Sequence, residues 1–146
     1  MSAHVPAALR QRVRERASGL CEYRLLHERD DWLAFQIDHL ISRKHGGRTT
    51  YSNLALACLD CNLAKGSDLG SLTRRSSVLI PFFNPRKDKW ADHFRLNVHR
   101  IVPLTDIGEV TCRIMGFNSP KRLVKRQAIS KAGRYPSIEA LALMRE

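Results

Sequence analysis

The sequence predicts an α+β fold with an N-terminal helix, a small core of strands and a helix, and a helical C-terminal extension. Three observations predict this class. Apolar residues recur at about every fourth position near the start, two short strand-like runs lie on either side of a Gly-Gly pair, and the last third carries repeated helix start and stop signals. A length of 146 residues is typical of one domain, so we expect a single domain over residues 1–146.

The first predicted element is a helix over residues 5–20. Its narrow apolar stripe consists of Val5, Leu9, Val13 and Ala17. Pro6 stands near the start and Gly19 near the end, as is typical of helix boundaries. Arginines at positions 10, 12, 14 and 16 are expected on the other faces of this helix.

The core is predicted to begin with a strand over residues 32–41, WLAFQIDHLI, which is rich in aromatic and β-branched residues. We expect this strand to end near His39. Gly46 and Gly47 then break the chain into a loop. Residues 54–57 predict a second short strand.

A short helix is predicted to follow the second strand. Asp60 is a residue type that caps helices, and the helix is expected to continue through Asn62 and Lys65 towards Leu69. This order of elements places most of the chemically interesting side chains at the ends of strands or on one helix.

The C-terminal part predicts an extended stretch, LNVHRIVPL, and three short helices over residues 105–115, 119–132 and 137–144. Pro120 at the first position of the second helix and Gly133 after its end fit helix boundaries. Between Glu109 and Glu139 there is no acidic residue, and seven basic residues fall there: Arg113, Lys121, Arg122, Lys125, Arg126, Lys131 and Arg134. This segment predicts either a second phosphate-contacting face or a solvated helix surface.

The overall charge indicates the class of partner. The chain has 25 Lys and Arg against 14 Asp and Glu, a formal net charge of +11. An excess of this size in a small domain favours a polyanion such as nucleic acid as partner, although basic surfaces also serve solubility.

Hydropathy and cysteine usage indicate the compartment. No apolar run approaches the roughly 20 residues that span a bilayer, and the first 20 residues lack the apolar middle of a signal peptide, so we expect no membrane partner and a cytoplasmic location. In a reducing compartment the Cys58 and Cys61 pair favours a metal knuckle or a redox pair over a disulfide framework. Cys112 lies among apolar residues and is expected to pack in the core.

Residues 37–66, IDHLISRKHGGRTTYSNLALACLDCNLAKG, bring together residue types that phosphodiester hydrolysis requires. His39 can act as a general base, because its unperturbed pKa of about 6.5 leaves much of it neutral near pH 7. Asp38 and Asn62 offer hard oxygen ligands that suit Mg²⁺ or Mn²⁺. Neighbours in a regular strand point to opposite faces, so Asp38 and His39 share one site only where the strand bends or ends.

The same stretch resembles the HNH endonucleases, whose ββα-metal core runs strand, loop, strand, helix around one divalent ion. GLCEYR at residues 19–24 is similar to the opening CEYC of that family. The resemblance covers residues 19–69. The motifs FFNPRKDKWADHF and PLTDIGEVT resemble the C-terminal extension of small stand-alone bacterial members, which implies an extension over residues 78–146.

The resemblance implies a role for each matching residue. His39 corresponds to the general base, Asn53 to the residue that pins the loop by hydrogen bonds, and Asp38 and Asn62 to the metal ligands. Asn62 stands where the family name calls for His, which makes this an HNN-type variant. Phosphate contacts are expected from the basic residues of the loop and helix, namely Arg43, Lys44, Arg48 and Lys65. An ordinary exposed lysine is the alternative interpretation of Lys65.

The sequence departs from the family at its zinc site. Members often hold a structural zinc with two Cys-x-x-Cys knuckles, and Cys58 and Cys61 form the second. The first has Cys21 but Arg24 in place of its second cysteine, and arginine cannot donate a lone pair to a metal. Either His27 or His45 completes a site with three cysteines, or packing and an ion pair of Arg24 replace the zinc.

The leading interpretation is a metal-dependent endonuclease that cuts or nicks DNA, with RNA left open as substrate. One alternative is a catalytically inactive nucleic-acid-binding module on an HNH frame. Another is a basic structural protein without a defined metal site. The form of the substrate, its sequence preference and the oligomeric state have no signal in the sequence.

Overall fold

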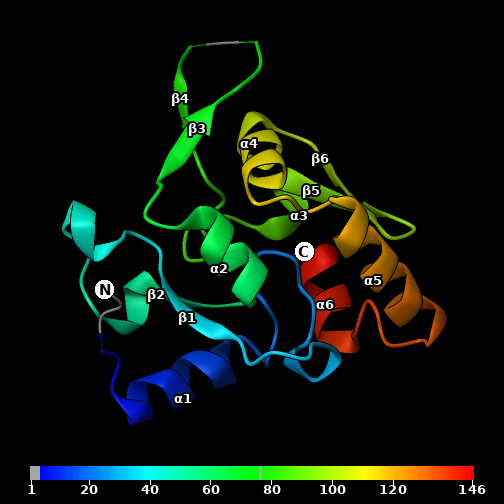
Figure 1. Ribbon diagram of the computed structural model, residues 1–146, viewed down its shortest axis with the longest axis horizontal. Helices are drawn as coiled ribbons and strands as arrows, with labels where there is room; N and C mark the ends of the chain where they lie inside the picture. The colour runs from blue at the N-terminus through cyan, green and yellow to red at the C-terminus, as the bar shows by residue number, and fades with distance from the viewer. Residues whose placement is uncertain (1–3, 76) are drawn as a thin grey trace. The chain divides into compact units, whose positions relative to one another are not determined.

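The computed structural model describes residues 4–75 and 77–146, and the chain divides into two compact units, residues 1–69 and 70–146 (Figure 1). Both units combine helices with small antiparallel sheets, which confirms the predicted α+β class. That the whole chain acts as one nuclease domain stays a prediction. Within the described residues, no helix has both the length and the apolar character needed to cross a membrane.

A two-stranded antiparallel hairpin forms the centre of the first unit. Strand β1 (Gln36–His39) pairs with β2 (Leu54–Ala57), so that Asp38 lies opposite Ala55 and His39 opposite Leu54. Helix α1 (Ala7–Arg16) packs on β2, and helix α2 (Leu59–Lys65) packs on β1. In Figure 1 the hairpin accordingly lies between the two helices. Three short 3₁₀ turns complete the unit: Glu28–Asp30, Arg43–His45 and Tyr51–Asn53.

Helix α1 is shorter than the predicted 5–20. It begins after Pro6 and ends at Arg16, and Ser18 and Gly19 then adopt positive φ angles of 53° and 72°. Two of its arginines bind the rest of the unit. Arg14 forms an ion pair with Glu28 at 2.6 Å, and Arg16 donates to the carbonyl oxygens of Tyr51 and Leu54.

The prediction of a strand starting at Trp32 is wrong, because β1 begins at Gln36. Trp32 is 96% exposed and no strand pairs with it. The backbone of Phe35 is bound by side chains instead of a neighbouring strand: its N–H donates to Glu28 at 2.7 Å and its carbonyl accepts from Arg14 at 3.3 Å. Composition alone favoured a strand here, but the neighbouring backbone needed for pairing is absent along this part of the described chain.

Strand β2 has the predicted bounds, whereas the cap of α2 differs. The N-cap is Cys58, whose sulfur accepts from the N–H of Cys61 at 3.4 Å, and Asp60 is the second helical residue. The helix ends at Lys65, before Gly66 with its φ of 53°, and does not reach Leu69. The prediction that Asp60 caps this helix is therefore wrong.

The second unit begins with a hairpin of β3 (Gly70–Leu72) and β4 (Leu79–Pro81), followed by the short helix α3 (Trp90–His93). None of these three elements was predicted. The stretch LNVHRIVPL, predicted to be extended, lies in a second hairpin of β5 (Phe94–Asn97) and β6 (Arg100–Pro103).

Three helices follow as predicted: α4 (Asp106–Ile114), α5 (Pro120–Lys131) and α6 (Ile138–Met144). Each begins directly after an N-cap residue, Thr105, Ser119 or Ser137, and the side chains of Thr105 and Ser137 accept a cap hydrogen bond. The cap and proline signals therefore located these helices to within a residue at either end.

Aromatic rings fill the core of the second unit. The Phe94 ring lies 5.4 Å from that of Phe83 and 5.6 Å from that of Phe117, between ring centroids. Helix α4 approaches the backbone of α3 closely at Gly108. A Cβ atom at this position would lie 2.2 Å from the carbonyl oxygen of His93. Only glycine fits this contact.

Some basic residues of the segment between Glu109 and Glu139 serve the fold. Arg126 is 2% exposed and donates to the carbonyl of His99 at 2.6 Å and to Asn118 at 2.8 Å. Arg122 is also buried and donates to the carbonyl of Met115. Arg113 pairs with Glu109 at 2.9 Å. Arg122 and Arg126 therefore belong to neither alternative, a phosphate-contacting face or a solvated helix surface. For the exposed basic residues of this segment both alternatives stay open.

Candidate functional site

The candidate site is built around the last two residues of β1. Asp38 is 4% exposed, and each of its carboxylate oxygens accepts a hydrogen bond: Oδ2 from the hydroxyl of Tyr23 at 2.6 Å and Oδ1 from Nζ of Lys65 at 3.3 Å. Nζ of Lys65 also donates to the carbonyl oxygen of His39 at 2.9 Å. Lys65 of α2 thus binds both residues of the Asp-His pair.

Burial and charge act in opposite directions on Asp38. Burial raises the pKa of its carboxyl group above the usual value, while the positive charge of Lys65 and the hydrogen bond from Tyr23 act to lower it. An isolated buried carboxylate would be costly, so the buried ammonium of Lys65, 3% exposed, is what makes the charge at this position tolerable.

His39 is half-buried, and its ring is oriented by Thr49. Nε2 of His39 lies 2.9 Å from the Thr49 hydroxyl, which also accepts from Arg43 at 3.2 Å. Burial lowers the pKa of His39, and this effect exceeds the opposing influence of the Asp38 charge. A ring with a lowered pKa is mostly neutral at pH 7 and can accept a proton.

Asn53 holds the loop between the two strands. Its Oδ1 accepts from the N–H of Ile41 at 3.0 Å, and its Nδ2 donates to the carbonyls of Ile41 at 3.0 Å and Arg48 at 2.9 Å. Gly47 packs directly against the backbone of Ile41. A Cβ atom at position 47 would lie 1.7 Å from the carbonyl oxygen of Ile41, so a larger residue would not fit. The loop that carries Thr49 is therefore fixed relative to β1.

Asn62, the second predicted metal ligand, is half-buried on α2. It precedes Lys65 by three residues, and residues at this spacing share one side of a helix. Since Lys65 extends to Asp38, Asn62 lies on the side of α2 that carries this contact.

The predicted phosphate-contacting residues have different surroundings. Arg43, Lys44 and Arg48 are exposed in the loop between the strands. Lys65 is buried and hydrogen-bonded to Asp38, so the alternative of an ordinary exposed lysine is wrong. A contact between Lys65 and phosphate stays a prediction.

Two residues of the site were missed from the sequence, Tyr23 and Thr49. Tyr23 is fully buried, and burial followed by the Asp38 charge raises the pKa of its hydroxyl well above the usual value, so it remains a donor. Tyr23 lies in the CEYR motif, but the motif does not indicate its contact with Asp38. Thr49 has no local signal, because its contact with His39 exists only once the loop has folded.

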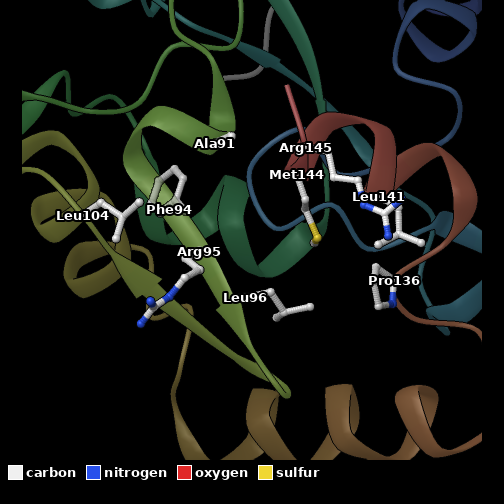
Figure 2. Close-up of a pocket in the computed structure, with 9 residues that line it drawn as sticks. All are labelled: Ala91, Phe94, Arg95, Leu96, Leu104, Pro136, Leu141, Met144 and Arg145. Atoms are coloured by element: carbon white, nitrogen blue, oxygen red, sulfur yellow. The ribbon is translucent and has the colours of Figure 1, made fainter.

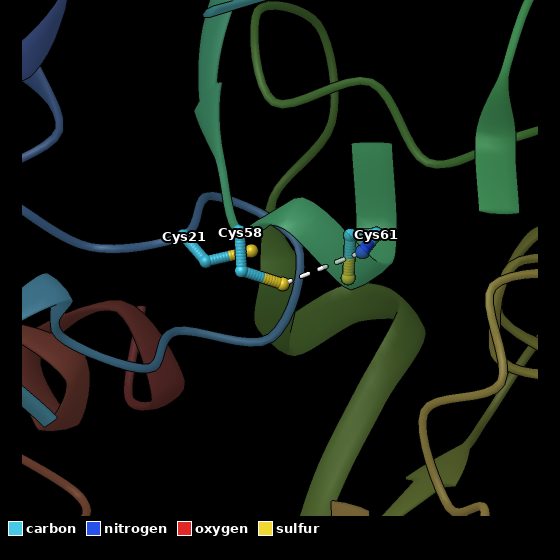
Figure 3. A group of neighbouring side chains, drawn as sticks. All are labelled: Cys21, Cys58 and Cys61. Carbon is cyan, nitrogen blue, oxygen red and sulfur yellow. Dashed lines mark hydrogen bonds between the residues drawn. The ribbon is translucent and has the colours of Figure 1, made fainter. Parts of the chain in front are cut away.

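A cluster of three cysteines lies in the same unit (Figure 3). The sulfur atoms of Cys21, Cys58 and Cys61 all lie within 4.8 Å of one another, close enough to share a metal ion, and all three residues are buried with free thiols. Arg24 is 1% exposed and donates from its guanidinium to the Cys58 sulfur at 3.2 Å. Among the described residues, the group of adjacent ligand residues consists of the three cysteines and includes neither His27 nor His45, the two histidines considered as a fourth ligand.

A pocket in the second unit holds none of the predicted site residues (Figure 2). It has a volume of about 400 Å³ and is lined mainly by apolar side chains, including Phe94, Leu96 and Leu141, with Arg95 and Arg145 contributing the charges. Its lining contains no Asp, Glu, His or Cys. The candidate site residues Asp38, His39, Asn53 and Asn62 all belong to the first unit.

Comparison with known proteins agrees with the geometry of the first unit. Residues 21–68 match the family model described as HNH endonuclease. No curated protein and no solved structure matches the chain. The matched segment contains Asp38, His39, Asn53 and Asn62 together with the cysteine cluster, and a domain of this kind indicates nuclease activity on nucleic acids. Over residues 21–68 the chain is therefore similar to the HNH endonuclease domain.

Proposed function

We propose that the protein is a divalent-metal-dependent endonuclease that hydrolyses phosphodiester bonds in DNA. The observation that carries the proposal is the contact between β1 and α2. Half-buried His39 follows Asp38 in β1, and Lys65 of α2 donates hydrogen bonds to both residues. The match of residues 21–68 to HNH endonucleases supports the same assignment. DNA as the substrate fits the predicted cytoplasmic location.

In this proposal His39 activates the attacking water. When Nε2–H of His39 donates to the Thr49 hydroxyl, the lone pair of the ring lies on Nδ1, which then takes the proton as water attacks phosphorus. Asn53 contributes by fixing the loop that carries Thr49. Each of these residues positions or moves a proton, which is the part of the reaction that the chain itself must supply.

The donor set at this site fits Mg²⁺ or Mn²⁺, with Asp38 and Asn62 as the residues that would hold it. An ionised carboxylate has about four lone-pair positions, and the bonds from Tyr23 and Lys65 use two of those on Asp38. The amide oxygen of Asn62 is also a hard ligand. When bound, such an ion would stabilise charge on the phosphate and on the departing 3′ oxygen.

DNA binding is assigned to the exposed basic residues of the loop, Arg43, Lys44 and Arg48. With a net charge of +11, the chain is expected to bind through phosphate contacts that release counterions, so affinity should fall steeply with salt.

The test is cleavage of supercoiled plasmid by the purified chain with EDTA, Mg²⁺ or Mn²⁺. We expect relaxation or linearisation that needs the ion and falls by about 10²-fold or more in His39→Ala, because general bases contribute at least that much. His4→Ala, which removes an exposed histidine of the same unit, is the matched control and should cleave like the wild type.

One observation favours the alternative of an inactive binding module on an HNH frame. The Asp38 carboxylate already has the buried ammonium of Lys65 as its counter-charge, so it is stable without an ion. In that case the wild type and His39→Ala would bind plasmid equally and leave it intact with every ion. This outcome would rule out the nuclease and leave the binding module.

A further inference from the structure

The cysteine cluster does not fit the structural zinc that the HNH resemblance implies. Structural zinc takes four protein ligands, and Cys21, Cys58 and Cys61 supply three. In the described residues no histidine, aspartate, glutamate or further cysteine joins them. All three are 0% exposed, which excludes bulk water as a fourth ligand. The position that would supply the fourth sulfur holds Arg24, which has no lone pair to give.

Arg24 brings a positive charge into the cluster instead. Its side chain is 1% exposed, and the guanidinium donates to the Cys58 sulfur at 3.2 Å. A buried cation requires a counter-charge. Burial acts to lower the pKa of Arg24, and the neighbouring cysteine sulfurs, including the hydrogen-bonded Cys58, act to raise it by more.

The three sulfurs are not equivalent. Hydrogen bonds from Cys21 and Cys61, together with the nearby charge of Arg24, lower the pKa of Cys58, whereas burial raises the pKa of Cys21 to about 12. Burial also raises the pKa of Cys61. The sulfur that accepts the hydrogen bond from Arg24 is therefore the one whose pKa is lowered.

The pair joins the same two segments that a zinc ion would join. Arg24 and Cys21 belong to the loop that follows α1, and Cys58 is the N-cap of α2, the helix that carries Asn62 and Lys65. The backbone adds two further links, because Glu22 and Leu56 exchange hydrogen bonds of 2.8 Å, one of them through the Glu22 carboxylate.

We propose that Arg24 replaces the structural zinc: its guanidinium and the Cys58 sulfur form a buried ion pair that holds the loop against the start of α2, and this fold forms without metal at the cluster. The proposal is independent of the catalytic assignment, since its tests measure zinc content and unfolding and not cleavage.

The first test uses the full chain purified from zinc-supplemented cells. We expect no stoichiometric zinc by elemental analysis and the same midpoint of thermal unfolding with and without a chelator. A chain that retains about one zinc ion, with a midpoint that falls on chelation, would overturn the proposal.

The second test converts the position back to a ligand. Arg24→Cys completes the two knuckles, so it should take up about one zinc ion per chain and become sensitive to chelators. Arg29→Cys, which places a cysteine at an exposed arginine nearby, should take up none. Folded Arg24→Cys without zinc would show that Arg24 does not occupy the fourth position, and would overturn the replacement.

A third pair of variants tests the charge without any metal. Arg24→Lys keeps the positive charge, and Arg24→Leu removes it, both at reduced size. We expect a larger fall in the unfolding midpoint for Arg24→Leu than for Arg24→Lys in chelator. Equal falls would show that packing alone accounts for Arg24, and would contradict the ion pair.

Discussion

The first unit contains two buried basic side chains at the two places where the HNH resemblance implies a metal ion, and their surroundings differ. Lys65 contacts Asp38 at 3.3 Å, beside half-buried His39. Arg24 contacts the Cys58 sulfur at 3.2 Å, inside a cluster of fully buried cysteines. The pair of Lys65 and Asp38 lies at a site whose carboxylate oxygens can accept further partners. The pair of Arg24 and Cys58 lies at a site that lacks a fourth zinc ligand.

The difference concerns what a positive charge of the chain does at each place. At Asp38, the ammonium stabilises a buried carboxylate that can still accept further partners, so it is compatible with a bound divalent ion. At the cysteines, in our proposal, the guanidinium takes the position of the missing ligand and leaves no place for a zinc ion. In our proposals, similar contacts therefore have opposite results: the site at Asp38 can bind a divalent ion, and the cysteine cluster cannot bind zinc.

The strongest way to break this comparison is to remove the charge at Lys65. Lys65→Met keeps most of the side-chain volume but leaves Asp38 buried without its counter-charge. We expect the free energy of unfolding to fall by about 3 kcal/mol or more, as for other buried pairs that lose one partner. Urea unfolding followed by circular dichroism measures it.

The control for Lys65 is Lys44→Met, an exposed lysine of the same unit, which should change stability by less than about 0.5 kcal/mol. If both variants lose the same small amount, the ammonium of Lys65 is not what stabilises Asp38, and the comparison with Arg24 fails.

A smaller effect is expected at Thr49, which orients the candidate base. Thr49→Val removes the hydroxyl that lies 2.9 Å from Nε2 of His39 while keeping the side-chain shape. Loss of one hydrogen bond of about 1 kcal/mol should lower kcat for plasmid cleavage by roughly fivefold to tenfold and leave KM unchanged. A rise in KM with unchanged kcat would assign Thr49 to DNA binding instead.

Thr50→Val is the matched control, since Thr50 is exposed and its hydroxyl contacts Ser52. It should leave both constants at wild-type values. This pair of variants separates the orientation of His39 from a general effect of altering the loop.

The elements that could be predicted are those specified by nearby residues. Ser119 and Pro120 mark the start of α5, and α5 lies within a residue of its predicted bounds at each end. The strand predicted over residues 32–41 depended on a pairing partner that composition cannot reveal, and only its last part forms β1. The hairpin of β3 and β4 was missed because its pairing joins segments without a strong local signal.

The candidate site shows the same division. Asp38, His39, Asn53 and Asn62 could be named because they lie in one short motif, and their catalytic and metal-binding roles stay predictions. The contact of Tyr23 with Asp38 and the burial of Lys65 could not be named, because both arise when segments 15 and 27 residues apart in sequence pack together. Sequence therefore identified the candidate groups, and packing determined what surrounds them.

The partly exposed ion pair of Arg14 and Glu28 is expected to stabilise the fold less than the two buried pairs. Burial acts to raise the pKa of Glu28, but the hydrogen bonds from Arg14 and from the N–H of Phe35 act more strongly, and the net result is a pKa below the ordinary 4.5. The unfolded chain then binds more protons than the folded one at acid pH, so the stabilisation is present above about pH 4.5 and is lost as pH falls through the lower, folded pKa. Since both side chains are about 30% exposed, Glu28→Gln should cost about 1 kcal/mol at pH 7, less than the buried pairs, and progressively less in acid. Urea unfolding of the wild type and Glu28→Gln between neutral and acid pH measures this difference. A difference that grows in acid would show that the carboxylate is not stabilised by Arg14, and that exposure does not rank these pairs.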